Sequence, residues 1–409
     1  MNMRILVITQ YYLPEPGATA NRLSAFVDAM VKRGHQVTVI CEFPNHPTGV
    51  LSRKDRWRLY RVEKSGGCRI IRTFVLAFPR KNFIMRMLFY LSFAFSSLVA
   101  GILIGKNDIV FASSPPPFCA YGAMIIAYLK RSKFVLDIRD LLTEAAQDMG
   151  TVKSNMLIRL GENLDRRCYK NASLIITATQ GFKTQIDIMG GKGKSHVIYN
   201  GSDEAMLSWD GDKEEIRRSL GWDGKFIIGF MGLIGLPQNP TELLPEIACL
   251  RDEGLLFVFV GDGPGKGRLI KGIADLGIRN VRLIGHVTRD EAISLTHAAD
   301  VMLIILRELE FSRSTIPSKF FDSMAAGKPI ISNVDGELRG LMEKHKTGIY
   351  FSYGTENSFA KAVMTLYNDR DLRKTLGDNG RSLVKERFLR KNLALEAMAA
   401  IESLFKSLT

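Results

Sequence analysis

The segment from Glu308 to Asn333 contains residues whose types and spacing fit the binding of a diphosphate. Pro317 stands where a helix would begin, and Ser318 and Lys319 follow it directly. An anion at a helix N-terminus meets backbone N–H groups that have no partner within the helix, and here a hydroxyl and an ammonium would join them. One turn further along, Asp322 can accept hydrogen bonds from a ribose diol. The alternative is a capped helix with a solvated lysine.

Two further loops in the second half of the chain offer backbone groups to a ligand. Gly261 and Gly263 follow an apolar, strand-like run, where glycine permits a tight turn into a helix close to a ligand. Another such run ends at Gly285, and the backbone of His286 and Val287 can contact the edge of a base. For both loops the alternative is a purely structural turn, with His286 packing or hydrogen bonding within the protein.

A third candidate loop lies near the start of the sequence, in the stretch QYYLPEPGATANR. Gly17, Ala18 and Thr19 have small side chains, so backbone N–H groups at the start of the next helix can approach an anion. The chain contains neither GxGxxG nor GxxxxGKS/T, which argues against nicotinamide-dinucleotide and P-loop chemistry. Here too the alternative is a structural turn.

The elements that must position these loops are short apolar strands alternating with helices, a pattern that predicts parallel sheets covered on both faces. The strands expected in the first half are Arg4–Thr9, Gln36–Cys41, Arg69–Phe74, Asp108–Ser113, Lys133–Ile138, Ser173–Ala178 and His196–Asn200. Those expected in the second half are Phe226–Gly232, Leu256–Gly263, Asn280–Gly285, Val301–Leu306, Pro329–Asn333 and Thr347–Phe351. Ligands of such sheets bind at the carboxyl ends of strands, where the strand order reverses. Every candidate loop follows a predicted strand.

Domain boundaries are predicted from the change of pattern along the chain. A polar stretch from Gly201 to Gly224 separates two similar α/β halves and is expected to be the linker between them. After Gly354 the pattern is helical to the end. We therefore predict an N-terminal domain over residues 1–204 and a second domain over residues 205–388, followed by a last helix within residues 389–409.

Composition excludes several classes of protein. The 409 residues are 46% hydrophobic, which rules out disorder and is enough for two or three domains. The five cysteines are scattered, without the spacing of a metal or redox site, and their odd number fits a reducing cytoplasm. The first residues lack the plan of a signal peptide, so we expect a cytoplasmic protein. Because the cysteines lack the spacing of a metal site, we expect no bound metal.

The positive charge of the chain is concentrated in one region. The net charge is +14 (56 basic against 42 acidic residues), and Arg53–Arg86 alone contributes +9, from eleven basic and two acidic residues. The uncharged run Met87–Gly105 follows at once. It fits a helix buried against the sheet, a helix on an anionic membrane surface, or a helix with one face in each environment. Nucleic acid is not expected as a partner, because stacking aromatics and known binding motifs are absent.

Taken together, the ordered motifs resemble the bacterial glycosyltransferases of family 4, in the branch that builds O-antigen, capsule and exopolysaccharide. The segments that carry the resemblance are KRGHQVTVIC, SSPPPF, FVLDIRDLLTE, VIYNGSD, FVGDGPG, NVRLIGHV and PSKFFDSMAAGKPII. The resemblance implies the GT-B fold, with two Rossmann-like doubly wound parallel-sheet domains facing across a cleft and a C-terminal crossover helix that packs back on the first domain.

The resemblance implies that the protein transfers a sugar from a nucleotide diphosphate with retention of configuration. It also implies that this transfer needs no metal. UDP is the expected nucleotide, as a co-substrate and not as a bound cofactor. The acceptor would be a saccharide or a polyprenyl-diphosphate-linked sugar, which would give residues 53–105 a role on an anionic membrane surface at the inner face of the cytoplasmic membrane. The residues expected to bind the donor are Gly17, Ala18, Gly232, Gln238, Gly261, Gly263, His286, Val287, Arg313, Ile316, Pro317, Ser318 and Asp322.

The sequence departs from the family at three places. The usual glutamates eight positions apart are Ser314 and Asp322, and the usual Arg and Lys after the first strand of the second domain are Leu233 and Gln238. We therefore expect Lys319, with Arg313 second, to neutralise the diphosphate.

The third departure concerns the first domain, where the common His-Asp pair is Arg139-Asp140. The residues predicted to be catalytic are Lys319, Asp140, Arg139 and Asp137. Lys319 would stabilise the leaving group, and the other three would orient the acceptor or handle its proton. The alternative for these three is an ion-pair cluster at a strand end.

Two other classes of function remain open for this architecture. A nucleotide-sugar epimerase of the same fold is one alternative, although the basic and apolar stretch favours a transferase. A homologue that binds a nucleotide sugar without turnover is the other, because of the departures at Leu233, Gln238 and Ser314.

Overall fold

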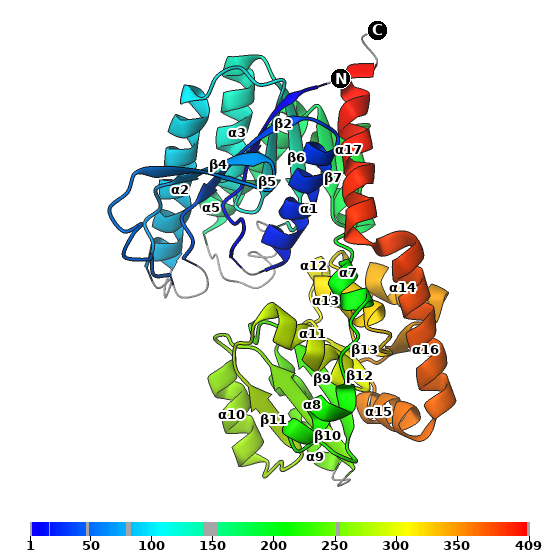
Figure 1. Ribbon diagram of the computed structural model, residues 1–409. Coiled ribbons are helices and arrows are strands. Elements are labelled where there is room, and N and C mark those ends of the chain that lie inside the picture. The colour runs from blue at the N-terminus through cyan, green and yellow to red at the C-terminus, as the bar shows by residue number, and fades with distance from the viewer. Residues whose placement is uncertain are drawn as a thin grey trace. The chain divides into compact units, whose positions relative to one another are not determined.

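A computed structural model gives the structure of the protein and describes residues 2–15, 17–45, 49–78, 83–141, 154–250 and 254–406. The chain forms two compact units, one made of Met1–Asn200 with Arg390–Thr409 and the other of Gly201–Leu389. Each unit is built around its own sheet (Figure 1).

The first unit contains a sheet of eight strands in the order β3-β4-β2-β1-β5-β6-β7-β8. The strands are β1 (Arg4–Ile8), β2 (Gln36–Glu42), β3 (Tyr60–Ser65), β4 (Cys68–Thr73), β5 (Ile109–Ser114), β6 (Lys133–Ile138), β7 (Leu174–Thr177) and β8 (Ser195–Val197). All neighbours pair in parallel except β3, which runs antiparallel to β4 at the edge. The strand order reverses between β1 and β5.

Helices cover both faces of this sheet because its buried strands are apolar on both sides. Ile5 and Val7 of β1 join one core, and Leu6 and Ile8 join the other. The first core is closed by α1 (Ala18–Lys32) and α17 (Arg390–Lys406), which lie against each other (Figure 1). The second is closed by α2 (Phe83–Leu103), α3 (Pro117–Lys130), α5 (Asn155–Asn171), α6 (Gln180–Ile186) and the π-turn η1 (Asp187–Gly191).

The second unit repeats the plan with a fully parallel sheet in the order β11-β10-β9-β12-β13-β14. Its strands are β9 (Phe226–Met231), β10 (Leu255–Val260), β11 (Val281–Ile284), β12 (Val301–Ile304), β13 (Ile330–Ser332) and β14 (Gly348–Tyr350). The order reverses between β9 and β12, so the loops that follow these strands flank the point at which such sheets bind ligands.

The helices of the second unit pack on both faces of its sheet. They are α7 (Glu204–Leu207), α8 (Lys213–Ser219), η2 (Pro240–Leu243), α9 (Leu244–Cys249), α10 (Lys266–Asp275), α11 (Arg289–Ala298), α12 (Glu310–Arg313), α13 (Ser318–Ala325), α14 (Glu337–His345), α15 (Ser358–Asn368), α16 (Arg370–Leu383) and η3 (Val384–Phe388).

The expected doubly wound parallel sheets are confirmed in both units, whereas two local expectations are wrong. Strand β3 was not predicted, because an edge strand with one neighbour needs no continuous apolar run and its sequence, YRVEKS, is mostly polar. The stretch Gly201–Gly224 is not an open linker. It contains α7 and α8, the Trp222 side chain is 3% exposed, and Arg217 forms an ion pair with Asp300 at 2.8 Å.

Candidate functional site

In the second unit, two loops approach each other closely beside the reversal of strand order. Gly232 follows β9 and Gly261 follows β10, both at positive φ (129° and 137°). A Cβ atom at Gly261 would stand 1.9 Å from the carbonyl oxygen of Gly232, and one at Gly263 would stand 2.5 Å from that of Ile234. These loops therefore need glycine so that backbone can pack against backbone at the strand ends.

Lys319 reaches this point from the first turn of α13. A Cβ atom at Gly232 would lie 3.5 Å from its Nζ atom, which stands 3.9 Å from the ring centroid of Phe230. The side chain is partly exposed as a whole, but the nitrogen is buried and makes no hydrogen bond to any residue that the structure describes. Burial lowers the pKa of Lys319 to about 7. The structure thus places an amino group, without a hydrogen-bond partner among the described residues, at the switch point of the sheet.

The start of α13 is held in place by apolar anchors. Ile316 is 3% exposed, Pro317 is the N-cap, and Phe320 and Phe321 are fully buried. Pro317 provides no side-chain cap, and the N–H groups of the first turn, beginning with that of Ser318, have no acceptor one turn earlier in the helix. This is the geometry in which an anion is favoured.

Asp322 lies one turn further along α13 and already has a partner. The hydroxyl of Ser202 donates a hydrogen bond of 2.6 Å to its Oδ1 atom. Ser202 is fully buried and was missed by the sequence interpretation, because 120 residues separate it from Asp322. The ribose-binding role of Asp322 stays a prediction.

The other predicted donor residues lie at the ends of neighbouring strands. Gln238 has a buried Oε1 atom without a hydrogen-bond partner among the described residues. His286 is exposed, and Val287 packs on one of the two cores. Arg313 pairs with Asp335 at 3.7 Å on the surface, so its charge is partly compensated, unlike that of Lys319.

In the first unit, Arg139 connects three loops around the reversal between β1 and β5. Its Nε atom donates to Ser113 Oγ at 2.8 Å and its Nη2 atom to the carbonyl oxygen of Pro115 at 2.8 Å. Its Nη1 atom donates to the hydroxyl of Thr19, which follows Gly17 and Ala18 at the start of α1. The structure therefore brings the predicted N-terminal loop and the strand-end arginine together.

Asp137 is sealed inside the first unit. Its Oδ1 atom accepts hydrogen bonds from Arg22 (Nη2 at 2.9 Å), its Oδ2 atom accepts one from Ser113 at 3.2 Å, and the residue is 0% exposed. These contacts bury both carboxylate oxygens beside Arg22 and Ser113, and the catalytic role of Asp137 stays a prediction. Arg22 was missed by the sequence interpretation, although it stands four residues before Phe26, over whose ring it stacks at 4.7 Å.

Asp140 differs from Asp137 in its surroundings. Its Oδ1 atom is buried without a hydrogen-bond partner among the residues described. Burial raises the pKa of Asp140, and the nearby Arg139 opposes that shift. A carboxylate of raised pKa beside a guanidinium suits proton handling or acceptor binding.

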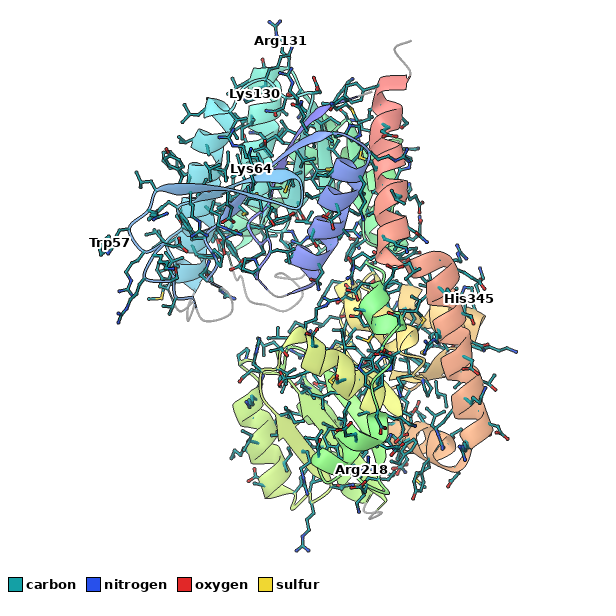
Figure 2. The ribbon with its side chains drawn as sticks, viewed as in Figure 1. Trp57, Lys64, Lys130, Arg131, Arg218 and His345 are labelled. Atoms are coloured by element: carbon teal, nitrogen blue, oxygen red, sulfur yellow. The ribbon has the colours of Figure 1, made fainter. Side chains whose placement is uncertain are left out.

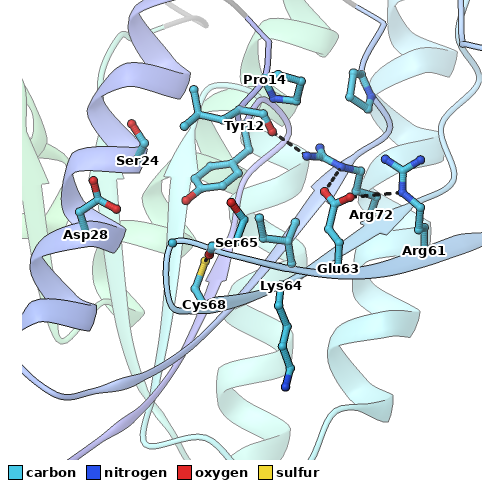
Figure 3. Close-up of a pocket in the computed structure, with 14 residues that line it drawn as sticks. Tyr12, Pro14, Ser24, Asp28, Arg61, Glu63, Lys64, Ser65, Cys68 and Arg72 are labelled. Carbon is cyan, nitrogen blue, oxygen red and sulfur yellow. Dashed lines mark hydrogen bonds and ion pairs between the residues drawn. The ribbon is translucent and has the colours of Figure 1, made fainter.

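A cavity of about 430 Å³, lined by apolar and charged residues, lies elsewhere in the first unit, between α1, the β1 loop and the β3–β4 hairpin (Figure 3). Glu63 bridges Arg61 and Arg72 there, at 3.4 Å and 2.6 Å, and Arg72 also donates to the carbonyl oxygen of Leu13. None of the predicted site residues lines this cavity. In the described parts of the chain, no three His, Cys, Asp or Glu side chains gather as a candidate metal site.

Comparison with known proteins covers almost the whole chain. The family model described as Glycosyltransferase Family 4 matches residues 19–205, and the model described as Glycosyl transferases group 1 matches residues 212–383. A protein of Escherichia coli (strain K12) named as the colanic acid biosynthesis glycosyl transferase WcaI is 27% identical over 336 residues, which are 80% of this chain and 82% of that protein.

Two further proteins are similar over nearly their full lengths. The GDP-mannose-dependent alpha-mannosyltransferase of Mycolicibacterium smegmatis is 23% identical and covers 90% of each chain. The crystal structure of Anabaena HepE in complex with UDP and glucose has a TM-score of 0.74 at 18% identity, over 98% of this chain and 100% of that one. With both family models matched in succession on two doubly wound units, the chain belongs to the glycosyltransferases of GT-B fold.

Proposed function

We propose that the protein is a retaining, metal-independent glycosyltransferase that moves a sugar from a UDP-sugar to a saccharide or polyprenyl-diphosphate-linked acceptor in the synthesis of a cell-surface polysaccharide. The observation that carries the proposal is the buried amino group of Lys319 beside Gly232 and the start of α13, which has no hydrogen-bond or ion-pair partner among the described residues. A buried ammonium without a hydrogen-bonded anion is costly for the fold, which favours a bound anion as its partner.

The reaction that fits this arrangement depends on stabilising the leaving group. The bond between the sugar C1 and the diphosphate oxygen breaks as the acceptor oxygen bonds to C1 on the same face, and the departing phosphate takes the acceptor proton. Negative charge then grows on the diphosphate, and Lys319 and the N–H groups at the start of α13 would stabilise it. Asp140 would hold the acceptor hydroxyl, and Arg139, whose guanidinium nitrogens already have partners, would position the loops around it.

Metal independence follows from the same groups, because an ammonium and a helix N-terminus supply the positive charge that a divalent cation supplies elsewhere. We expect transfer to continue unchanged in excess EDTA. Loss of activity in EDTA that magnesium or manganese restores would overturn this part of the proposal.

The choice of nucleotide and product rests on the relatives. The structural similarity to HepE, which was crystallised with UDP, supports a UDP-sugar, whereas the similarity to a GDP-mannose-dependent enzyme makes GDP the alternative. The similarity to WcaI, named for colanic acid biosynthesis, supports a cell-surface polysaccharide as the product. A lipid-linked acceptor would keep the enzyme at the inner face of the cytoplasmic membrane.

The test is a panel of UDP-, GDP- and dTDP-sugars with and without saccharide acceptors. Release of free nucleotide that depends on the acceptor marks a transferase, and an anomeric configuration kept in the product marks retention. Interconversion of the donor sugar would indicate an epimerase, and binding without turnover would indicate a binding protein. Lys319→Gln should lower kcat/KM by about 100-fold or more, as loss of one oxyanion-type contact does. Lys271→Gln, an exposed lysine of α10, is the matched control.

A further inference from the structure

Helix α2 presents an apolar stripe to solvent along its whole length. Every residue of the stripe is 42% to 69% exposed, and the spacing of three or four residues places them all on one face. The stripe consists of Ile84, Leu88, Leu91, Phe95, Val99 and Ile102. At 1.5 Å per residue it extends over about 27 Å. Isolated apolar side chains on a surface are ordinary, but a continuous row of six is an interaction surface.

The opposite face of α2 fixes how the helix can meet a partner. Phe89 and Phe93 are fully buried in the core that also contains β2 and β4. The helix is long and apolar enough to span a bilayer by length and composition. However, β4 precedes it and β5 follows it in the same sheet, and its buried face packs on that sheet and on α3. It therefore lies flat on the unit and can enter a membrane only by its exposed face.

A basic loop with an exposed tryptophan adjoins this helix. Residues 49–51 and 56–59 share a groove of about 560 Å³ with residues 74–78, which lead toward α2. The N–H of Leu76 donates to Ser92 of α2 at 2.9 Å, and the hydroxyl of Ser96 donates to the carbonyl oxygen of Phe74 at 2.6 Å. Trp57 is 90% exposed and points away from the fold (Figure 2).

The exposed charge of this loop is positive only. The single acidic residue between positions 53 and 58, Asp55, is 5% exposed and pairs with Arg61 inside the unit. The four basic residues of the same segment are all exposed: Arg53, Lys54, Arg56 and Arg58. The apolar row of α2, the exposed Trp57 and the exposed basic side chains together fit a partner with an apolar interior and an anionic surface layer.

We propose that the stripe of α2 and the loop 53–59, together the docking surface, bind an anionic phospholipid bilayer with α2 parallel to the membrane plane. A second copy of the chain fits less well, because the loop carries four exposed cations and no exposed carboxylate to pair with their equivalents. On the proposed function, the docking surface is also where the enzyme would meet a lipid-linked acceptor. The membrane contact itself does not depend on that function.

Co-sedimentation of the full-length protein with vesicles tests the docking surface. We expect binding to phosphatidylcholine vesicles that contain phosphatidylglycerol, with little binding to phosphatidylcholine alone. Leu91→Gln/Phe95→Gln should weaken the partition coefficient by about 10-fold or more. Arg56→Gln/Arg58→Gln should weaken it by about 5-fold for each charge removed, and only for the anionic vesicles.

The matched controls lie on α10 in the second unit. Ile270→Gln replaces an apolar side chain that is 49% exposed, and Arg268→Gln/Lys271→Gln removes two exposed charges, so both should sediment like the unmodified protein. Equal binding of the stripe variant and the unmodified protein would overturn the proposal. So would a dimer, detected by sedimentation velocity without vesicles, that the stripe variant dissolves.

Trp57 provides a second readout of the same surface. Trp222 is 3% exposed and Trp209 is half-buried against His297, whereas Trp57 is 90% exposed, so a change in emission on vesicle binding should come mainly from Trp57. Anionic vesicles should shift the emission to the blue, and Trp57→Phe should abolish the shift while most sedimentation remains. Vesicle binding that persists in a protein that binds no nucleotide sugar would refute the proposed function and leave the docking surface intact.

Discussion

At the scale of residues, the site is defined by which charges are paired inside the fold. Arg139, Asp137 and Arg313 each have partners in their own unit, whereas Nζ of Lys319 and Oδ1 of Asp140 are buried and have no hydrogen-bond partner among the described residues. Groups held in this way store an unfavourable desolvation free energy that a ligand can relieve. We therefore propose that the paired residues position the site and that Lys319 and Asp140 meet substrate.

The first prediction concerns the proton of Lys319. Because burial lowers the pKa of Lys319 to about 7, the side chain is mostly neutral in the free protein at about pH 8. A bound diphosphate raises that pKa, so UDP binding should take up close to one proton at about pH 8 and much less at about pH 6, where the lysine is already charged. Calorimetry in buffers of different ionisation enthalpy measures this number.

The control variants for proton uptake are Lys319→Gln, which should show none, and Lys271→Gln, which should behave like the unmodified protein. The same titration predicts that kcat/KM falls as the pH rises through about 7, because the free enzyme loses its ammonium there. Proton uptake that survives in Lys319→Gln would assign the titrating group elsewhere.

A second prediction compares two aspartates three residues apart. Asp140→Asn should lower kcat by about 100-fold or more. It should leave the free energy of unfolding unchanged or higher, since it removes a charge whose buried Oδ1 atom has no hydrogen-bond partner among the described residues. Asp137→Asn should lower the free energy of unfolding by about 3–5 kcal/mol, because Arg22 is left buried without its partner.

The effect of Asp140→Asn on the free energy of unfolding should depend on pH. The pKa of Asp140 is raised, so its charge opposes folding above that pKa and ceases to do so as the pH falls through it. The stability difference between Asp140→Asn and the unmodified protein should therefore shrink on acidification, as measured by chemical denaturation. A large destabilisation by Asp140→Asn at neutral pH would instead assign Asp140 to the structure.

At the scale of elements, the donor loops depend on close backbone approach between the ends of β9 and β10. Gly261→Ala would place a Cβ atom 1.9 Å from the carbonyl oxygen of Gly232, at a φ of 137°. We expect a loss of about 1–3 kcal/mol or more in the free energy of unfolding and weaker UDP binding, because both loops must move apart.

The matched control for Gly261→Ala is Gly267→Ala in α10. A Cβ atom there meets nothing within 4 Å, and alanine favours a helix interior by about 0.5–1 kcal/mol. Thermal unfolding and UDP titration of both variants check the pair. Equal behaviour of the two alanines would show that the close approach has no energetic role.

The strands and the start of α13 could be predicted because their signals are local. Continuous apolar runs mark buried parallel strands, and Pro317 followed by Ser318 and Lys319 marks a helix start that suits an anion. Strand β3 could not be predicted, because an edge strand has one side in solvent and therefore tolerates a polar sequence.

The partners of the site residues could not be predicted because they are distant in the chain. Arg22 and Asp137 are 115 residues apart, and Ser202 and Asp322 are 120 apart. Nothing in either local sequence indicates such a contact. The contact of Lys319 with Phe230 could not be predicted either, because Phe230 has the sequence pattern of any residue in a buried strand. The sequence therefore predicts Lys319 as a site residue but not the burial of its amino group, which lowers its pKa.

At the scale of the whole molecule, each unit buries its own core, and the end of the chain belongs to the first one. Helix α17 contributes Leu393, Ala397, Met398 and Ile401 to the core that α1 closes, although the second unit intervenes in the sequence. The first unit is thus completed only when the last helix has been made. Apart from Gly17 and Ala18, the residues expected to bind the donor belong to the second unit.

This division predicts that two perturbations act on different unfolding transitions in scanning calorimetry. Ile401→Ala removes a fully buried side chain from the first unit and should cost it about 2–5 kcal/mol, lowering the Tm of one transition. UDP binds the second unit in our proposal and should raise the Tm of the other, by mass action. The exposed neighbour Ser403→Ala should change neither. A single transition that both perturbations shift would mean that the two units unfold as one cooperative body.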